Sequence, residues 1–102
     1  VGSVYVADVV KDYLVNIVAA TRSHDAVRLG ASPRASLHLI RTARAKAALA
    51  GRDYVIPDDV QAMAIPVLAH RLLPSTRAQL DGISPVDIVS QILTSTPVPE
   101  QA

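Results

Sequence analysis

Three stretches of this sequence carry a proline at or beside their first residue and then continue as amphipathic runs, a pattern that strongly constrains the fold. The stretches are residues 33–50, 57–70 and 84–93. Proline suits the first position of a helix, because its missing N–H group has no intrahelical partner there. An earlier run, residues 6–21, repeats apolar side chains at the same helical spacing. The sequence therefore predicts an all-α fold of four helices.

The composition supports one small domain. The chain has 102 residues, half of them hydrophobic, but it has no Phe or Trp and only three Tyr. Its core must be built from Val, Leu, Ile and Ala, which suits closely packed helices. Without cysteine the chain has no disulfide and no thiolate metal site, a composition at ease in a reducing cytoplasm, where we expect the protein to act. Because the chain starts at Val1 and not at Met, we expect it to be a piece of a longer protein.

No apolar run is long enough to predict a membrane span, and no segment resembles a signal peptide. Residues 97–102 contain two prolines that cannot continue a helix. We therefore expect a helical domain over residues 1–96 and a disordered tail over residues 97–102.

The connections are predicted to be mainly irregular. Residues 21–29 are expected to form a polar connection, and residues 72–83 an irregular segment. Extended structure is expected in at most two very short pieces, near Tyr54 to Ile56 and near Arg71 to Leu73. Inside the third predicted helix, Pro66 removes one backbone hydrogen bond, which predicts a kink or a broken last turn.

The sequence Gly30-Ala31-Ser32-Pro33-Arg34 predicts a place for an anion. Gly30 can take backbone angles that other residues resist, Ser32 is a good N-cap, and Pro33 suits the first helical position. Arg34 then lies at a helix N-terminus, where free N–H groups and the forked donors of a guanidinium both match phosphate oxygens. The same residues also fit an ordinarily capped helix with a solvated arginine.

Basic side chains gather on one face of the second predicted helix. At 100° per residue, Arg34, His38 and Arg41 fall together, with Arg44 beside them. This face is either a solvated surface or a binding surface. The formal net charge of only +1 argues against a dedicated nucleic-acid binder.

Several kinds of catalytic site are missing from the sequence. It has neither a Gly-x-x-x-x-Gly-Lys-Ser/Thr loop nor a Gly-x-Gly-x-x-Gly turn, so it holds at most half of a nucleotide site. Its three histidines are too dispersed to predict a metal site. Asp58 and Asp59 are neighbours on a helix and point about 100° apart, so we interpret them as acids that favour the helix start.

Four motifs follow one another in an order and spacing that resemble the C-terminal lid of MoxR-type AAA+ ATPases. The motifs cover nearly the whole chain and are TRSH at 21–24, VRLGASPRA at 27–35, GRDYVIPDDV at 51–60 and VLAHRL at 67–72. The resemblance implies a small helical subdomain that follows an α/β ATP-binding core. One departure is Ile56, where similar lids commonly have a threonine that caps the third helix.

The resemblance also implies a role for each residue of the turn before the second helix. Arg34 takes the position of the sensor-2 residue, which responds to the γ-phosphate of ATP, while Gly30, Ala31, Ser32 and Pro33 provide the supporting turn and cap. ATP and Mg²⁺ would be bound mainly by the core, and the fragment alone is expected to bind neither tightly and to be inactive.

The implied partners are the core of the same chain, neighbouring subunits of a ring, and client proteins of a chaperone-like machine. A stand-alone helical interaction module that uses the Arg34, His38 and Arg41 face is the alternative from a different class. A small DNA-binding domain is disfavoured by the nearly neutral charge.

Overall fold

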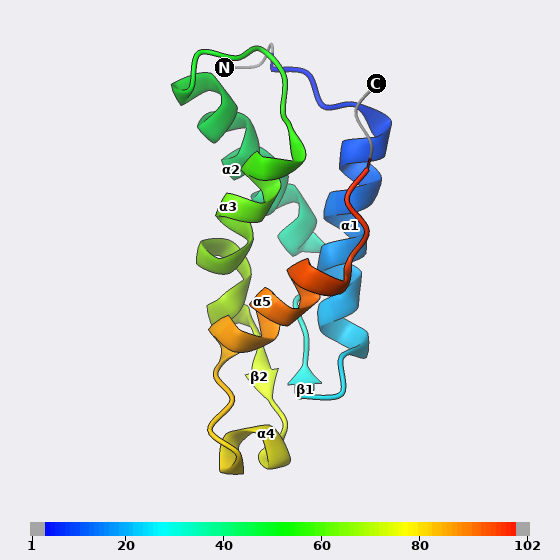
Figure 1. Cartoon of the computed structure of the whole chain (residues 1–102), viewed down its shortest axis with the longest axis vertical. Helices are drawn as coiled ribbons and strands as arrows, with labels where there is room; N and C mark the ends of the chain where they lie inside the picture. Colours follow the sequence, from blue (N-terminus) through cyan, green and yellow to red (C-terminus); the bar gives the residue numbers. More distant parts are fainter. Residues whose placement is uncertain (1–3, 100–102) are drawn as a thin grey trace.

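The computed structural model describes residues 4–99 and is predominantly helical (Figure 1). Its elements are α1 (Asp8–Ser23), β1 (Val27–Leu29), α2 (Arg34–Leu49), α3 (Pro57–Leu68), the 3-10 helix η1 (Ala69–Arg71), β2 (Leu73–Pro74), α4 (Thr76–Leu80) and α5 (Pro85–Ser95). The all-α fold class is confirmed. The four predicted helices correspond to α1, α2, α3 and α5, and their observed bounds differ from the predicted ones by at most a few residues.

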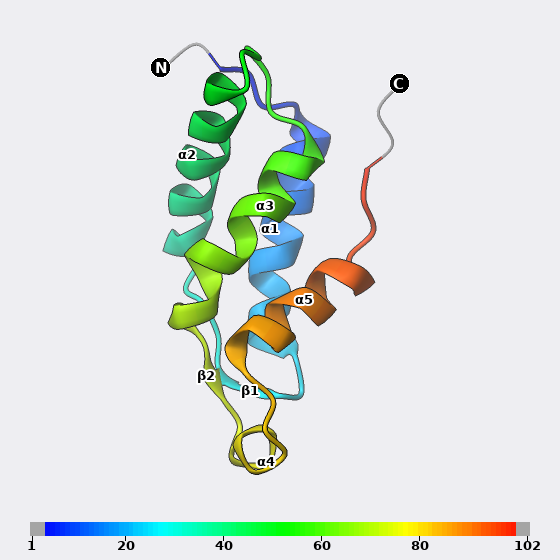
Figure 2. The same cartoon turned by 60° about the vertical axis from the view of Figure 1, so that its left-hand side comes forward.

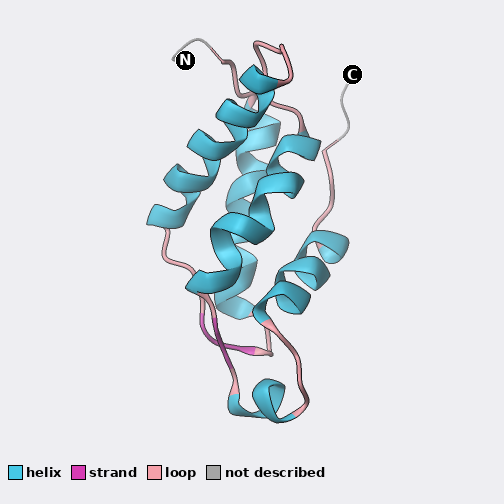
Figure 3. Ribbon diagram, turned by 90° about the vertical axis from the view of Figure 1, so that its left-hand side faces the viewer, coloured by secondary structure: helices cyan, strands magenta, loops and turns pink. Residues whose placement is uncertain are grey.

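The helices form an elongated bundle with extents of 44 × 24 × 20 Å. Helices α1, α2 and α3 run roughly along the long axis, and α5 lies across α1 and α3 (Figures 1 and 2). The connection between α2 and α3 lies at one end, whereas the two short strands and α4 lie toward the other (Figure 3). The start of α2 is therefore close to the strands and not to the α2–α3 connection.

Aliphatic side chains from four helices fill the core. Ile17 of α1, Leu39 of α2, Val60 and Ala64 of α3, and Ile88 of α5 are completely buried. Small residues on the inner face of α2, Ala35, Ala43 and Ala47, are also buried and let α3 approach closely. The predicted inner face of α2 is confirmed for Leu39, Ala43 and Ala47, while Ser36 and Ile40 are half-buried and Ala50 is exposed.

The end of α2 is fixed by Gly51, as the sequence predicts. Gly51 has a φ of +80°, a conformation that side chains with a Cβ rarely adopt. Its N–H donates to the carbonyl of Ala48, and the N–H of Arg52 donates to the carbonyl of Ala47. This pair of bonds is a Schellman motif, which satisfies carbonyl groups that the helix itself leaves free.

The start of α3 is fixed by Asp59. Its carboxylate accepts a hydrogen bond of 2.9 Å from the backbone N–H of Ile56 and two bonds, of 2.6 and 2.7 Å, from the guanidinium of Arg52. Burial works to raise the pKa of Asp59, but the bonds from Arg52 and Ile56 outweigh it and hold that pKa below its usual value. The structural interpretation of this acid is confirmed, and α3 begins at Pro57 despite Ile56 having no capping oxygen.

Helix α3 ends earlier than predicted. Its α-helical part stops at Leu68, two residues after Pro66, and the chain continues as η1 instead of reaching His70 in one helix. Pro66 has no N–H group to donate, so the broken last turn expected there is confirmed. The change to a 3-10 helix places Arg71 at the end of η1.

The two strands pair antiparallel, with Val27 opposite Pro74 and Leu29 opposite Leu73. Extended structure near Leu73 was expected, but β1 falls in the segment predicted to be a polar connection, so that prediction was wrong for residues 27–29. The other expected extended piece is a single parallel bridge between Tyr54 and Tyr5. The segment 72–83 was predicted to be irregular, but it contains helix α4. The Ser75 side chain caps the start of this helix, and Gly82, with a φ of +74°, follows its end.

The last described residues, 97–99, follow α5 without forming a helix or strand and lie beside α1 (Figure 1). They share a shallow hollow with Val9, Asp12 and Asn16 of α1. The rest of the predicted tail, 100–102, and residues 1–3 lie outside the described residues. The disorder of the tail and the domain boundary at residue 96 stay predictions.

Candidate functional site

The turn that leads into α2 is pressed against the end of α1 at Gly30. A Cβ atom at this position would lie 2.4 Å from the carbonyl oxygen of Thr21 and 2.8 Å from the Cα of Arg22. Within residues 4–99, φ is positive only at Gly51 and Gly82, so the expected reason for Gly30, an unusual backbone angle, is wrong. Glycine is required here because the two backbones approach so closely.

Ala31 is held by two side chains of α1. Its N–H donates to the Thr21 hydroxyl at 3.0 Å, and its carbonyl accepts from the Arg22 guanidinium at 3.1 Å. The Thr21 hydroxyl in turn donates to the carbonyl of Val18 at 2.6 Å. Ala31 and Thr21 are both buried, so the Thr21 bonds that hold the turn to α1 are shielded from water, while the Arg22 bond is partly buried. Sequence reasoning gave Thr21 and Arg22 no role, although both lie in a motif of the lid resemblance.

Ser32 does not cap α2 with its side chain, contrary to the prediction. The structure shows no side-chain capping bond at this helix start, and Ser32 is exposed. Instead, the carbonyls of Ser32 and Pro33 accept bonds of 2.9 and 3.0 Å from the N–H groups of Ala35 and Ser36. Pro33 already has helical angles (φ −55°, ψ −26°) just before the helix begins at Arg34. The two carbonyls can therefore accept from the first N–H groups of the helix, which a serine hydroxyl would otherwise satisfy.

Arg34 is exposed and lines a hollow of about 280 Å³. The other residues around it are Leu37, His38 and Arg41 of α2 and Arg71 of η1. The predicted grouping of Arg34, His38 and Arg41 on one helix face is therefore confirmed. Arg71 was not predicted to join them, because it comes from a different part of the chain.

The hollow is positively charged and contains no acid. The ion pairs found within the described part of the chain are Arg52–Asp59 and Arg77–Asp81, neither of which includes a residue of the hollow. Three arginines thus line one hollow that has no carboxylate in its lining. Guanidinium groups bind phosphate or carboxylate oxygens through paired N–H donors, so the arrangement suits an anion with several oxygens.

Arg44 lies outside this hollow, although the helical projection placed it beside the basic stripe. Its side chain is half-buried, and its Nε atom is buried without a hydrogen-bond partner among residues 4–99. Arg44 is therefore a poor comparison for an exposed arginine of the site.

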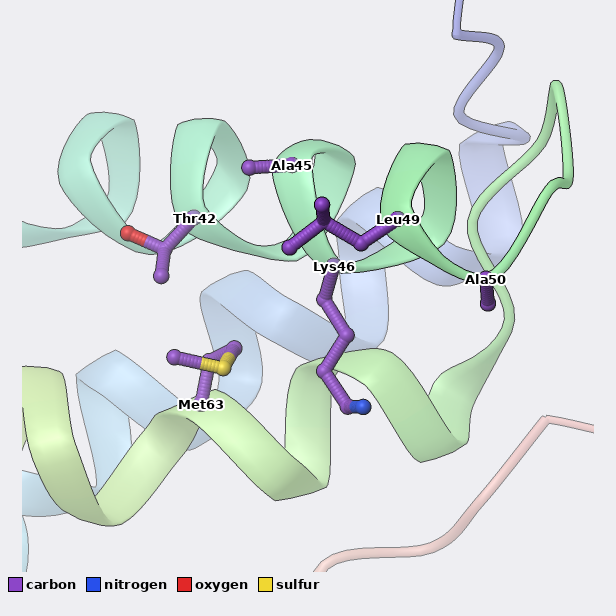
Figure 4. A pocket seen from close by; sticks show the side chains of 6 residues that line it. All are labelled: Thr42, Ala45, Lys46, Leu49, Ala50 and Met63. Atoms are coloured by element: carbon purple, nitrogen blue, oxygen red, sulfur yellow. The ribbon is translucent and has the colours of Figure 1, made fainter.

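A second hollow, of about 370 Å³, is lined by residues of α2 and by Met63 of α3 (Figure 4). Its walls are mainly carbon atoms and come from Thr42, Ala45, Lys46, Leu49, Ala50 and Met63. With Lys46 as its one cationic side chain, this hollow lacks the cluster of donors that a polyphosphate requires. Anywhere within residues 4–99, no three or more His, Cys, Asp or Glu side chains lie together as a metal site would require.

Comparison with known proteins identifies the family. A profile described as the AAA lid domain matches residues 19–92. The Bacillus subtilis (strain 168) protein YeaC is 45% identical over 101 residues, which are 99% of this chain and 32% of YeaC. "Chaperone MoxR1" of Mycobacterium tuberculosis is 42% identical over 98 residues, covering 87% of this chain and 26% of MoxR1.

A solved structure agrees with these sequence relatives. A Cytophaga hutchinsonii protein described as a candidate ATPase superposes with a TM-score of 0.90 at 30% identity, over 97% of this chain and 33% of that one. The chain therefore belongs to the AAA lid domain family, as a lid of the MoxR type. It spans about a third or less of the relatives it matches. In the described part of the chain, no helix has both the length and the apolar character needed to cross a membrane.

Proposed function

We propose that this lid closes over ATP held by an α/β core and that Arg34 detects the γ-phosphate. The observation that carries the proposal is the position of Arg34 at the first turn of α2, on a cation-lined hollow without an acid. The positive end of the α2 dipole and the guanidinium group of Arg34 both favour phosphate, and they lie together at this helix start. The lid-family match supplies the context in which such a site meets a nucleotide.

Arg34 can act as a sensor because its bonds to the terminal phosphate exist only while that phosphate is present. A charge-assisted hydrogen bond contributes about 1.5–3 kcal/mol. Loss of the γ-phosphate would remove this contribution and weaken the contact between lid and core. A ligand shifts the equilibrium between the open and closed lid by the difference in its affinity for the two states. The bonds of one arginine are therefore enough to change the ratio of closed to open lid by about tenfold or more.

The core provides what this chain lacks. A phosphate-binding loop and the ligands of Mg²⁺ lie outside this sequence, so ATP and Mg²⁺ are cofactors of the longer protein and the fragment alone binds neither tightly. Gly30 and Ala31 fix the turn before α2, and the carbonyls of Ser32 and Pro33 satisfy its first N–H groups. These four residues support Arg34 and hold it in place.

We further propose a chaperone-like role for the longer protein. ATP-driven closure of the lid would be passed to neighbouring subunits of a ring and used to remodel partner proteins. The name of the mycobacterial relative, "Chaperone MoxR1", supports this role. A cytoplasmic location fits the need for ATP and the absence of cysteine from the sequence.

The test is Arg34→Ala in the full-length protein. We expect the rate of ATP hydrolysis to fall by about 10²–10³-fold, the scale for removing one preorganised electrostatic donor. Stability should change by no more than about 0.5 kcal/mol, because Arg34 is exposed. Phosphate release measures the rate, and urea unfolding measures the stability.

The matched control is Arg77→Ala. Arg77 is an exposed arginine on α4, outside the hollow, in a surface pair with Asp81. Its loss should leave hydrolysis within about twofold of the wild type. Wild-type hydrolysis by the Arg34 variant, together with loss of a bound partner protein, would instead support a helical interaction module that uses the basic face.

A further inference from the structure

We propose that Arg71 is a second arginine contact to the same terminal phosphate, reaching it from the side opposite α2. This proposal rests on the function proposed above for Arg34. Arg71 lines the hollow with Arg34 and Arg41, but it belongs to η1 and not to α2. Anion binding would thus connect two separate segments of the lid.

One bond aims the Arg71 side chain. Its Nε donates to the carbonyl oxygen of Val67 at 2.9 Å, across the change from α3 to η1. A guanidinium has five N–H donors, and this bond uses one of them. The two terminal nitrogens of Arg71 remain available to an anion, while the side chain already has a fixed attachment point. A preorganised donor of this kind loses little freedom when it binds.

The small sheet brings Arg71 to Arg34. Strand β1 directly precedes the turn that leads into α2, and β2 follows η1 after a single residue, Leu72. Antiparallel pairing places Leu29 opposite Leu73 and Val27 opposite Pro74. The N–H of Ser75 also donates to the carbonyl of Ala26 at 2.8 Å. The two segments that carry the arginines are therefore fastened to each other beside the hollow.

The backbone at this helix start supplies fewer donors than an open N-terminus would. The N–H groups of Ala35 and Ser36 already bond to the carbonyls of Ser32 and Pro33. A phosphate group in the hollow must therefore rely mainly on side-chain donors. Arg34 lies on α2 and can donate to the phosphate only from that side of the hollow. Arg71 lies on η1, the second element that lines the hollow, and is the cation there. Two guanidinium groups facing one phosphate have enough donors for its terminal oxygens.

A purely structural role for Arg71 makes a different prediction. The Val67 carbonyl lies near the end of α3, where carbonyl groups lose their intrahelical partners, and the Arg71 bond satisfies it. If that were its whole function, removing the charge while keeping a donor would leave nucleotide binding unchanged. Arg71→Gln separates the two roles, because its amide can still donate to the Val67 carbonyl.

The experiment measures the affinity of the full-length protein for ATP and ADP in Mg²⁺, by competition with a fluorescent nucleotide. We expect Arg71→Gln to weaken ATP binding by about 10-fold and ADP binding by less than about 2-fold. Arg71→Lys keeps the charge and should stay within about 3-fold of the wild type. Arg77→Gln, which removes an exposed arginine of α4, should change neither affinity.

Arg34→Ala, measured in the same assay, distinguishes the two proposals. If Arg34→Ala lowers the preference for ATP over ADP but Arg71→Gln leaves it within about 2-fold, Arg71 is structural and this inference is wrong, while the proposed function stands. If neither substitution changes the preference, the sensor function of Arg34 fails as well. A lowered preference in Arg71→Gln with recovery in Arg71→Lys supports the two-arginine site.

Discussion

Replacing Gly30 by alanine tests the close contact on which the geometry of the site depends. The new Cβ would lie 2.4 Å from the Thr21 carbonyl oxygen, whereas ordinary contacts begin at 3.4 Å, so the two segments must separate by about 1.0 Å (3.4 − 2.4). The nearest atoms all belong to the backbone of α1, so no flexible side chain can swing away. Thr21 is completely buried, which makes the required movement more costly.

The expected cost follows from the effect of overpacking. Forcing an extra carbon into a packed site costs about 1–3 kcal/mol, and we expect the upper value because backbone must move. A domain of this size is stable by only about 5–15 kcal/mol. Each kcal/mol lowers the unfolding temperature of such a domain by about 4–8 °C, so Gly30→Ala should lower it by about 12–24 °C.

Thermal unfolding of the 102-residue chain, followed by circular dichroism, measures this effect. The control is Gly51→Ala, which requires a strained φ of +80° but meets nothing within 4 Å. That substitution should cost about 1 kcal/mol, or about 4–8 °C. The reasoning is refuted if Gly30→Ala melts within about 2 °C of the wild type, or if Gly51→Ala is the more damaging of the two.

Three further predictions concern charge and ligand binding. Because hydrogen bonds hold the pKa of Asp59 below its usual value, the stability they provide is complete above the unfolded pKa of about 3.9 and is lost as pH falls through the lower, folded pKa. The urea midpoint should therefore drop on acidification, and it should drop by less in Asp59→Asn. At neutral pH, Arg52→Ala should lower the urea midpoint, because the buried carboxylate of Asp59 then keeps only its bond from the Ile56 N–H. The isolated chain should bind ATP no tighter than about 1 mM, or about 4 kcal/mol, since the phosphate loop is absent; micromolar affinity by calorimetry would contradict the half-site interpretation.

The long helices could be predicted because their signals are local. Pro57 and Pro85 mark the first residues of α3 and α5, and Gly51 marks the end of α2. Strands of two or three residues contain no measurable alternation, so β1 and β2 left no periodic signal. Helix α4 is also too short for a helical repeat. Its boundaries, Ser75 and Gly82, were visible in the sequence but also fit an irregular loop.

The candidate site was predictable only where it lies on one helix. Arg34, His38 and Arg41 share a face because the helical period places them there. Arg71 reaches the same hollow through strand pairing and the change from α3 to η1, and both depend on tertiary structure. Gly30 was singled out for the wrong reason, since sequence alone does not show which backbone will pass beside a glycine.

The lid's small sheet links the proposed anion site to the rest of the fold. The turn before Arg34 is fastened to α1 through Thr21 and Arg22, and β1, just before that turn, pairs with β2, just after Arg71. Both arginines therefore sit on segments with little independent freedom. An arginine on a mobile loop would lose part of its binding energy in becoming ordered. If Arg34 and Arg71 bind phosphate as proposed, their anchored backbone segments would let a larger share of that binding energy contribute to closure of the lid. The proposed sensor would need such anchoring on two segments, because binding of one phosphate group would have to move the whole lid and not one side chain.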